Sequence, residues 1–283
     1  MPINLQPVWN ELIKIYDEIA KVCDRHHLRY FVSAGTLLGA VRHQGFIPWD
    51  DDFDLHMPRP DYIRFCEIAP KELPDHLKIV DYHNTREYMF RFLKVQETDR
   101  EVFRSISAES GYMNPHGLYV DIFPLDGRPD KFWETTWLKI KLFCAYARMT
   151  YLFRKGCHRG IKGYLGEYLG FIMGAFFGGI KTRKDWTCLY DQWSQKYDYE
   201  KCRLVGRFTD GVVRIGWNTR REAYSDFVDL PFGASTVKGP SGYEELLRLW
   251  YGDYMKLPPS EQQVSNHQVC EPAPWIYGPT GAE

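Results

Sequence analysis

The stretch SAGTLLGAVRHQGFIPWDDDFDLHM, residues 33–57, decides the fold of this chain. Its last part alternates in polarity, so we expect Asp52 and Asp54 on one face of a short strand and Phe53 and Leu55 on the other. Two carboxylates on one face repel each other, and a divalent cation between them relieves the repulsion. Oxygen ligands of this kind predict a site for Mg²⁺ or Mn²⁺, and a solvated acidic turn is the alternative.

The first half of the same stretch predicts a site for phosphate. Residues 30–32 are typical of a strand, and residues 37–42 are typical of a helix. Between them lie Gly35 and Thr36, in a turn where free backbone N–H groups and the helix dipole attract an anion. The alternative is a glycine–threonine helix cap with no ligand.

Four further residues are candidates for the same site. Arg42 and His43 lie at the end of the expected helix, close enough in sequence to the aspartates to reach a diphosphate. Lys94, on an expected strand over residues 89–96, is a candidate phosphate ligand, with a solvent-facing position as the alternative. Asp121 interrupts an apolar strand, and burial of an unpaired carboxylate is costly. Its positive partner is therefore a metal shared with the two aspartates or, alternatively, an arginine.

These motifs carry a resemblance to a known family. The blocks concerned are Gly35-Thr36 with residues 39–43 and 45–55, then GLYVDIFP at residues 117–124 and YGDYMKLPP at residues 251–259. Together they resemble the LicD family of phosphocholine transferases, which is related to fukutin and fukutin-related protein. That family is a branch of the nucleotidyltransferase superfamily, whose pattern is a glycine-containing turn followed by an Asp-x-Asp strand.

The resemblance implies an α/β (α+β) fold with a nucleotidyltransferase-like mixed sheet core and a helical insertion. It implies that Asp52, Asp54 and Asp121 are catalytic metal ligands, with Asp121 on a neighbouring strand. Gly35, Thr36, Arg42, His43 and Lys94 would then bind the substrate. The implied reaction is Mg²⁺-dependent transfer of phosphocholine from CDP-choline to a hydroxyl of a cell-surface glycan or its lipid-linked precursor, with release of CMP.

Three rival functions stay open at this point. The same aspartates would serve a nucleotidyltransferase that moves NMP from an NTP, or a phosphotransferase with an ethanolamine- or ribitol-linked donor. A different class is a non-catalytic membrane-binding module built on residues 131–184. The acidity of residues 50–54 opposes it, because such a run is a poor neighbour for anionic lipid and a good one for Mg²⁺.

Composition excludes some partners and compartments. With 36 basic and 37 acidic residues the chain is nearly neutral, so we expect no nucleic acid partner. Its seven scattered cysteines include no Cys-x-x-Cys pair, which favours reduced thiols in the cytosol. The first residues lack a basic segment followed by an apolar run, so we expect no secretory signal and a cytoplasmic protein.

The middle of the chain differs from the rest in charge. Residues 131–184 hold eleven Lys or Arg against Glu134 and Glu167, a net charge of +9 (11 − 2), interleaved with aromatic residues. Residues 168–180 are uncharged but too short to span a bilayer, which needs about 20 residues. We expect peripheral attachment to an anionic membrane surface at its inner face, with a buried helical hairpin as the alternative.

The periodicities also predict the order of elements. We expect a catalytic core over residues 1–130, a basic and aromatic helical insertion over residues 131–200, and a C-terminal segment over residues 201–283 that packs back on the core. Expected helices cover residues 5–25 and 61–68, a segment that includes Trp133 and Trp137, a segment that includes Trp186 and Trp193, and residues 243–250. Expected strands cover residues 77–81, 89–96, 117–123, 204–209, 212–217 and 227–232.

Overall fold

The structure, a computed structural model, describes residues 5–85, 88, 90–98, 103–107, 112–154, 168, 172, 182–209 and 219–264. The chain forms two compact units, each discontinuous in sequence. Unit 1 comprises Met1–Val80, Leu93–Phe123 and Ala223–Glu283, and unit 2 comprises Asp81–Phe92 and Pro124–Glu222. Helices and strands are mixed along the chain, which confirms the expected α+β class. The expected division at residues 130 and 200 stays a prediction.

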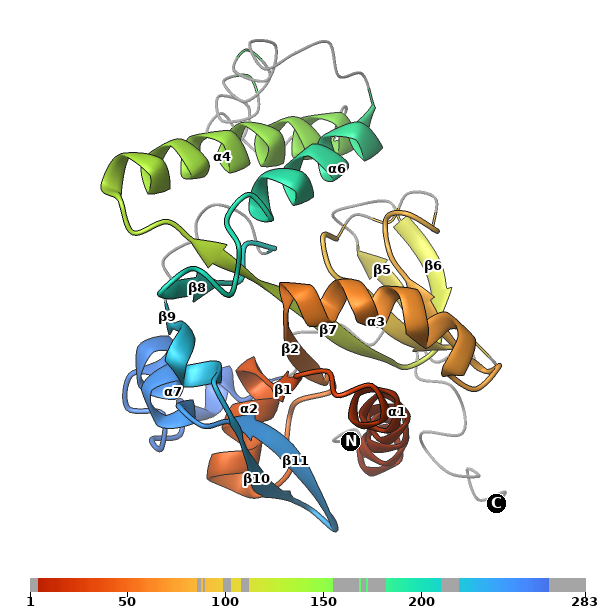
Figure 1. The fold of residues 1–283 in the computed structure, drawn as a ribbon. Coiled ribbons are helices and arrows are strands. Elements are labelled where there is room, and N and C mark those ends of the chain that lie inside the picture. The colour runs from red at the N-terminus through yellow and green to blue at the C-terminus, as the bar shows by residue number, and fades with distance from the viewer. Residues whose placement is uncertain are drawn as a thin grey trace. The chain divides into compact units, whose positions relative to one another are not determined.

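The main sheet of unit 1 has the strand order β1-β2-β7-β4-β3. The pairs β1–β2, β7–β4 and β4–β3 are antiparallel. Two hairpins, β5–β6 and β10–β11, are separate from this sheet (Figure 1). The strands are β1 (Phe31–Val32), β2 (Asp54–Pro58), β3 (Leu77–Val80), β4 (Leu93–Glu97), β5 (Phe103–Ser107), β6 (Tyr112–His116), β7 (Tyr119–Arg128), β10 (Phe227–Phe232) and β11 (Ser235–Pro240).

Helices cover the core of unit 1. They are α1 (Gln6–Arg25), α2 (Ala34–His43), α3 (Arg59–Glu72) and α7 (Tyr243–Tyr251), with the short 3-10 helix η3 (Ser260–Gln262). Another 3-10 helix, η2 (Arg221–Tyr224), begins with the last two residues of unit 2 and ends in unit 1. The predicted N-terminal helix is confirmed as α1, which buries Leu12, Tyr16, Ile19 and Cys23 at helical spacing. These side chains join one core cluster with the apolar residues of β2, β4 and β7.

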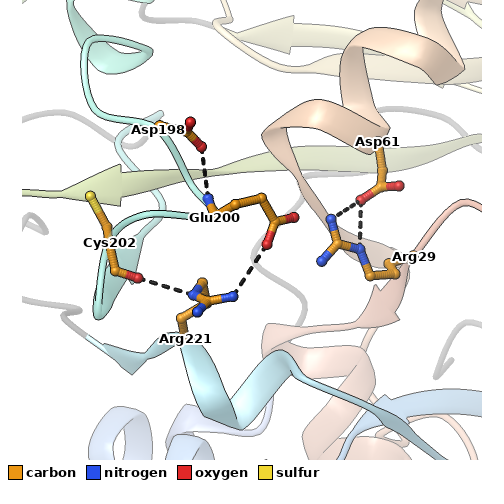
Figure 2. Close-up of polar contacts among 6 residues, drawn as sticks. All are labelled: Arg29, Asp61, Asp198, Glu200, Cys202 and Arg221. Atoms are coloured by element: carbon orange, nitrogen blue, oxygen red, sulfur yellow. Dashed lines mark hydrogen bonds and ion pairs between the residues drawn. The ribbon is translucent and has the colours of Figure 1, made fainter.

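Polar contacts tie the loops to the helices. In unit 1, Arg29 pairs with Asp61 at 2.7 Å and so fixes the segment before β1 to the first turn of α3 (Figure 2). In unit 2, the Arg221 side chain donates to the Cys202 carbonyl and to the Glu200 carboxylate (Figure 2). In each case the arginine fixes the course of a segment that has few regular backbone bonds.

Unit 2 is built on two helices that lie side by side, α4 (Phe132–Arg154) and α6 (Arg183–Ser194) (Figure 1). Leu138, Leu142 and Met149 of α4 pack against Trp186 and Tyr190 of α6. The helix predicted around the two tryptophans of α6 is thereby confirmed, and a capping box of Thr182 and Asp185 begins it. The end of β7 pairs with β8 (Leu204–Gly206), which pairs with β9 (Thr219–Arg220).

Arg91 contacts two aromatic rings of unit 2. Its guanidinium lies 5.4 Å from the Tyr146 ring centroid and 4.7 Å from that of Tyr190, and it donates to the Thr209 carbonyl. Cation–π contacts of this kind hold the planar guanidinium between the two rings. The strand expected over residues 89–96 accordingly begins only at Leu93.

Several predicted boundaries differ from those observed. The Asp-x-Asp strand begins at Asp54, because its neighbour β1 ends at Val32, which pairs with Leu55. Asp52 therefore precedes the strand. The strand expected over residues 117–123 runs on to Arg128, where β8 supplies a further partner.

Parts of two other predictions lie outside the described residues. They are the strand over residues 212–217 and the uncharged run over residues 168–180, except for Tyr168 and Ile172, which are helical and exposed. Among the described helices, none is both long enough and apolar enough to span a bilayer.

Gly39 on α2 is the glycine whose replacement should cost most in unit 1. A Cβ there would overlap the Gly45 carbonyl oxygen and lie 3.3 Å from the Ile47 nitrogen. We expect Gly39→Ala to lower the free energy of unfolding by at least about 2 kcal/mol, because backbone atoms would have to move. Urea unfolding measures this change.

Gly45→Ala is the matched control for this variant. Its Cβ would meet only the Gly233 nitrogen, at an ordinary 3.6 Å, so we expect a change within about 0.5 kcal/mol. Equal stability of the two variants would show that the close approach of α2 to the following loop is unnecessary.

Candidate active site

The site lies on the face of the main sheet that is turned away from the core. Successive side chains of a strand point to opposite faces. Leu55 on β2, Val120 on β7 and Val95 on β4 are fully buried in the core cluster. The residues next to them, Asp54, Asp121 and Lys94, therefore share the other face. Strand alternation places three of the predicted site residues together.

Four carboxylates gather around Tyr119, two residues before Asp121 on β7. Burial raises the pKa of the Tyr119 hydroxyl well above its usual value, and the negative charges of Asp121, Asp52, Asp51 and Asp54 raise it further. Of these, Asp51, Asp54 and Asp121 are buried and Asp52 is half-buried. Buried carboxylates need nearby positive charge.

Lys94 supplies part of that charge. It is opposite Asp121 in the antiparallel register of β4 and β7, and its Nζ lies 2.6 Å from Asp121 Oδ1. The same Nζ lies 3.4 Å from the ring centroid of Tyr119. The side chains of Lys94 and Asp121 are only 11% and 13% exposed. The structure thus gives Asp121 a positive partner that the sequence analysis did not name for it, the lysine Lys94.

The predicted phosphate turn begins helix α2. Ser33 is the N-cap residue, and its fully buried hydroxyl oxygen has no hydrogen-bond partner among the described residues. Ala34 follows with a φ of +46°, a backbone conformation that is costly for a residue with a Cβ. A buried hydroxyl beside the N–H groups of a ten-residue helix suits an anionic ligand.

Hydrogen bonds join this turn to the carboxylate strand. The Ser33 nitrogen donates to the Asp54 carbonyl at 3.0 Å, and the Asp54 nitrogen donates to Thr36 Oγ1 at 2.9 Å. Thr36 therefore positions Asp54. On the other side of β2, the Asp121 nitrogen donates to the Phe53 carbonyl at 2.9 Å. The turn, Asp54 and Asp121 thus form one hydrogen-bonded arrangement.

Gly35 brings another carboxylate to the turn. A Cβ on Gly35 would lie 2.6 Å from Asp50 Oδ2, so glycine gives the Asp50 side chain its room. The Asp50 carbonyl accepts from Trp9 Nε1 at 2.8 Å, which anchors the acidic run to α1. An anionic ligand at this turn would meet the Asp50 charge, and a cation would have to offset the repulsion.

Arg42 and His43 lie at the opposite end of α2, about 15 Å along the helix from Ser33. Arg42 donates to the carbonyls of Tyr254 and Lys256 at 3.1 and 3.3 Å, and its Nε donates to His43 Nε2 at 2.9 Å. Burial, together with the charge of Arg42, lowers the pKa of His43, and burial lowers that of Arg42. Their contact with a diphosphate stays a prediction.

The sequence reasoning missed Tyr119, Asp51 and Asp50 as parts of this site. Strand alternation could have found Tyr119, because it shares a face with Asp121. The positions of Asp50 and Asp51 depend on a loop and on Trp9 of α1, which no periodicity reveals.

Comparison with known proteins identifies the family of the part of the chain that carries this site. Residues 27–153 match the nucleotidyltransferase domain described as LicD/FKTN/FKRP. This stretch is a LicD-family domain. The resemblance expected from the sequence motifs is therefore confirmed, and the matched stretch contains the turn, the acidic run, Lys94 and Asp121.

Two relatives of this chain are named for their activity. It is 28% identical to the lipopolysaccharide cholinephosphotransferase LicD of Haemophilus influenzae, over 90% of this chain and 92% of that protein. It is 32% identical to the human ribitol 5-phosphate transferase FKRP, over 42% of this chain and 21% of that protein. Both names describe transferases of a phosphorylated group, which confirms the expected enzyme class, a phosphotransferase.

Proposed function

We propose that this chain transfers phosphocholine from CDP-choline to a hydroxyl of a glycan or its lipid-linked precursor and releases CMP. The observation that carries the proposal is the hydrogen-bonded arrangement of the α2 turn with Asp54 and Asp121. A phosphate site and a carboxylate site in direct contact are what transfer of a phosphorylated group requires. The name of the Haemophilus influenzae relative supports choline as the substituent and lipopolysaccharide as the acceptor class.

The carboxylates of the site are suitable ligands for Mg²⁺ or Mn²⁺. The described residues hold no group of three or more His, Cys, Asp or Glu arranged as a complete metal site. Mg²⁺ in phosphoryl-transfer sites commonly takes one or two carboxylates and completes its shell with water and substrate phosphate. Asp54 and Asp52, with Asp121 beside them, can supply those carboxylates. A metal bound there would neutralise the charge on the donor diphosphate.

The chain's own groups have separate roles in this proposal. The N–H groups at the start of α2 and the Ser33 hydroxyl bind donor phosphate oxygens. Lys94 holds Asp121 in place and adds positive charge next to the donor. Asp121 accepts the proton of the acceptor hydroxyl as the new oxygen–phosphorus bond forms and the bond to CMP breaks.

Donor choice is tested by incubating the purified chain and Mg²⁺ separately with CDP-choline, CDP-ribitol and CTP, each with a glycan acceptor. We expect CMP release and acceptor modification with CDP-choline, at a rate at least about tenfold above the other donors, because the proposed site must fit the phospho-substituent that is transferred. Asp54→Asn is the control for contaminating activity.

The three donors separate the rival functions. Faster use of CDP-ribitol would remove the choline assignment and leave the phosphotransferase class intact. Pyrophosphate release from CTP, with none of the CDP-linked donors used, would instead support the nucleotidyltransferase.

Choline's quaternary ammonium cannot donate hydrogen bonds, so its pocket should offer aromatic rings. Trp49, half-buried with its ring centroid 6.3 Å from that of His43, is one candidate, and Trp217 lies outside the described residues.

A further inference from the structure

Helix α4 is apolar on two sides, and only one of them is packed. Leu138, Leu142, Ala145 and Met149 follow one another at helical spacing and are buried against α6. A helix that carries apolar residues on a second side normally buries that side as well. In α4, that second side is exposed.

The exposed residues are aromatic. The α4 aromatic face, as we call it, consists of Phe132, Trp133, Trp137 and Phe143, which are 81%, 66%, 49% and 40% exposed. Trp133 and Trp137 are four residues apart and so lie on one side of the helix. Single exposed apolar residues are ordinary, but four large aromatic side chains on one helix mark an interaction surface.

The charges around this face are mostly of one sign. Lys131 Nζ lies 5.6 Å from the Trp133 ring centroid, and Lys141 Nζ lies 5.6 Å from that of Trp137. Lys139 lies on the same helix, whose one acidic residue, Glu134, is 3.9 Å from Lys131. A partner surface that complements the α4 aromatic face is therefore both anionic and able to accept aromatic rings.

We infer that the α4 aromatic face docks on an anionic phospholipid surface. Tryptophan settles at the boundary between head groups and acyl chains, while lysine is attracted to anionic head groups. The inference rests on the proposed function in one respect: a lipid-linked acceptor would be presented at such a surface. It also refines the sequence-based prediction of membrane attachment by assigning the attachment to four aromatic side chains and the lysines beside them.

Vesicle flotation with the full chain tests the inference. We expect binding to vesicles of phosphatidylglycerol and phosphatidylcholine, weaker binding to pure phosphatidylcholine, and a loss of binding as salt rises. The triple variant Phe132→Ser, Trp133→Ser, Trp137→Ser should weaken binding to the anionic vesicles at least about tenfold. The double variant Lys139→Gln, Lys141→Gln should weaken it by about fivefold for each lysine that reaches the lipid surface, most strongly at low salt.

The matched control replaces two equally exposed apolar side chains of unit 1, Leu249→Ser with Met255→Ser, which are 49% and 56% exposed. We expect the control to bind vesicles as the wild type does. Circular dichroism should show unchanged helix content in every variant, because none of the replaced side chains is buried. Equal binding by the wild type and the triple variant, or no binding by either, would overturn the inference.

Two further measurements separate this inference from its alternatives. Transfer to a short water-soluble acceptor should be unchanged in the triple variant, and Asp54→Asn should still bind vesicles, so docking and catalysis can fail independently. Gel filtration at two protein concentrations tests a contact between two copies of the chain. A concentration-dependent dimer that the triple variant abolishes, without vesicle binding, would show that the face binds protein and would refute lipid docking.

Discussion

Asp54→Asn is expected to lower the transfer rate at least about thousandfold, a loss of about 4 kcal/mol of transition-state stabilisation, without unfolding the protein. Only 8% of the surface of Asp54 is exposed, and its side chain lies among carboxylates of the same sign. Asparagine keeps the shape and removes the charge, so the cation and the donor phosphates lose a ligand. Repulsion within the site falls at the same time, and the free energy of unfolding should stay equal or rise.

The measurement pairs kcat with the thermal midpoint across a Mg²⁺ titration. Asp52→Asn should behave in the same direction, although Asp52 is half-buried and precedes the strand. Asp75→Asn, an exposed carboxylate of unit 1, is the control and should leave both quantities unchanged. Near-normal kcat for Asp54→Asn at saturating Mg²⁺ would refute the role of Asp54 as a metal ligand.

The parts of the fold that the sequence predicted well are those with a strong local pattern. The amphipathic stripe of α1 gave a helix whose observed bounds, Gln6–Arg25, differ little from the expected residues 5–25. The strand, turn and helix at residues 30–42 were also expected, because glycine, threonine and a short aromatic strand mark such a turn locally.

The parts that it could not predict depend on partners distant in sequence. The buried side of α4 is set by Trp186 and Tyr190 of α6, and Trp133 and Trp137 of the predicted helix lie on its exposed side. Of the four strands in the hairpins β5–β6 and β10–β11, the sequence predicted only β10. Its partner β11 has an ordinary composition and is defined by its pairing with β10. Pairing of this kind leaves little trace in a single sequence.

The site followed the same rule. Alternation predicted Asp52 and Asp54 on one face of a strand, but β2 begins at Asp54. The ion pair of Lys94 with Asp121 joins residues 27 positions apart. Their contact depends on the register of β4 against β7, and a shift of one residue would turn Lys94 to the other face. The sequence analysis therefore predicted Lys94 as a phosphate ligand. For Asp121, which Lys94 contacts in the structure, it expected a metal or an arginine.

Lys94→Met should be the most destabilising of the site variants, by about 3 kcal/mol or more. Lys94 and Asp121 are both nearly inaccessible to solvent, and removal of one partner deprives the other buried charge of this ion pair. Loss of Lys94 would also leave Asp51, Asp52 and Asp54 with less positive charge nearby, which adds to the cost. Lys78→Met on β3, where the residue is exposed, is the matched control and should change stability by less than about 0.5 kcal/mol.

A double-mutant cycle separates the ion pair from the rest of the site. In Lys94→Met with Asp121→Leu, both charges are replaced by apolar groups, so we expect the free energy of unfolding to recover most of what Lys94→Met loses. Transfer activity should stay lost in the double variant, because the carboxylate proposed to accept the proton is gone. Urea unfolding gives the stabilities, and CMP release gives the activities.

If Lys94→Met were as stable as the wild type, the negative charge of Asp121 would have to be balanced by other groups. If the double variant were no more stable than Lys94→Met, the lost stability would come from the cation–π contact with Tyr119 rather than from the ion pair.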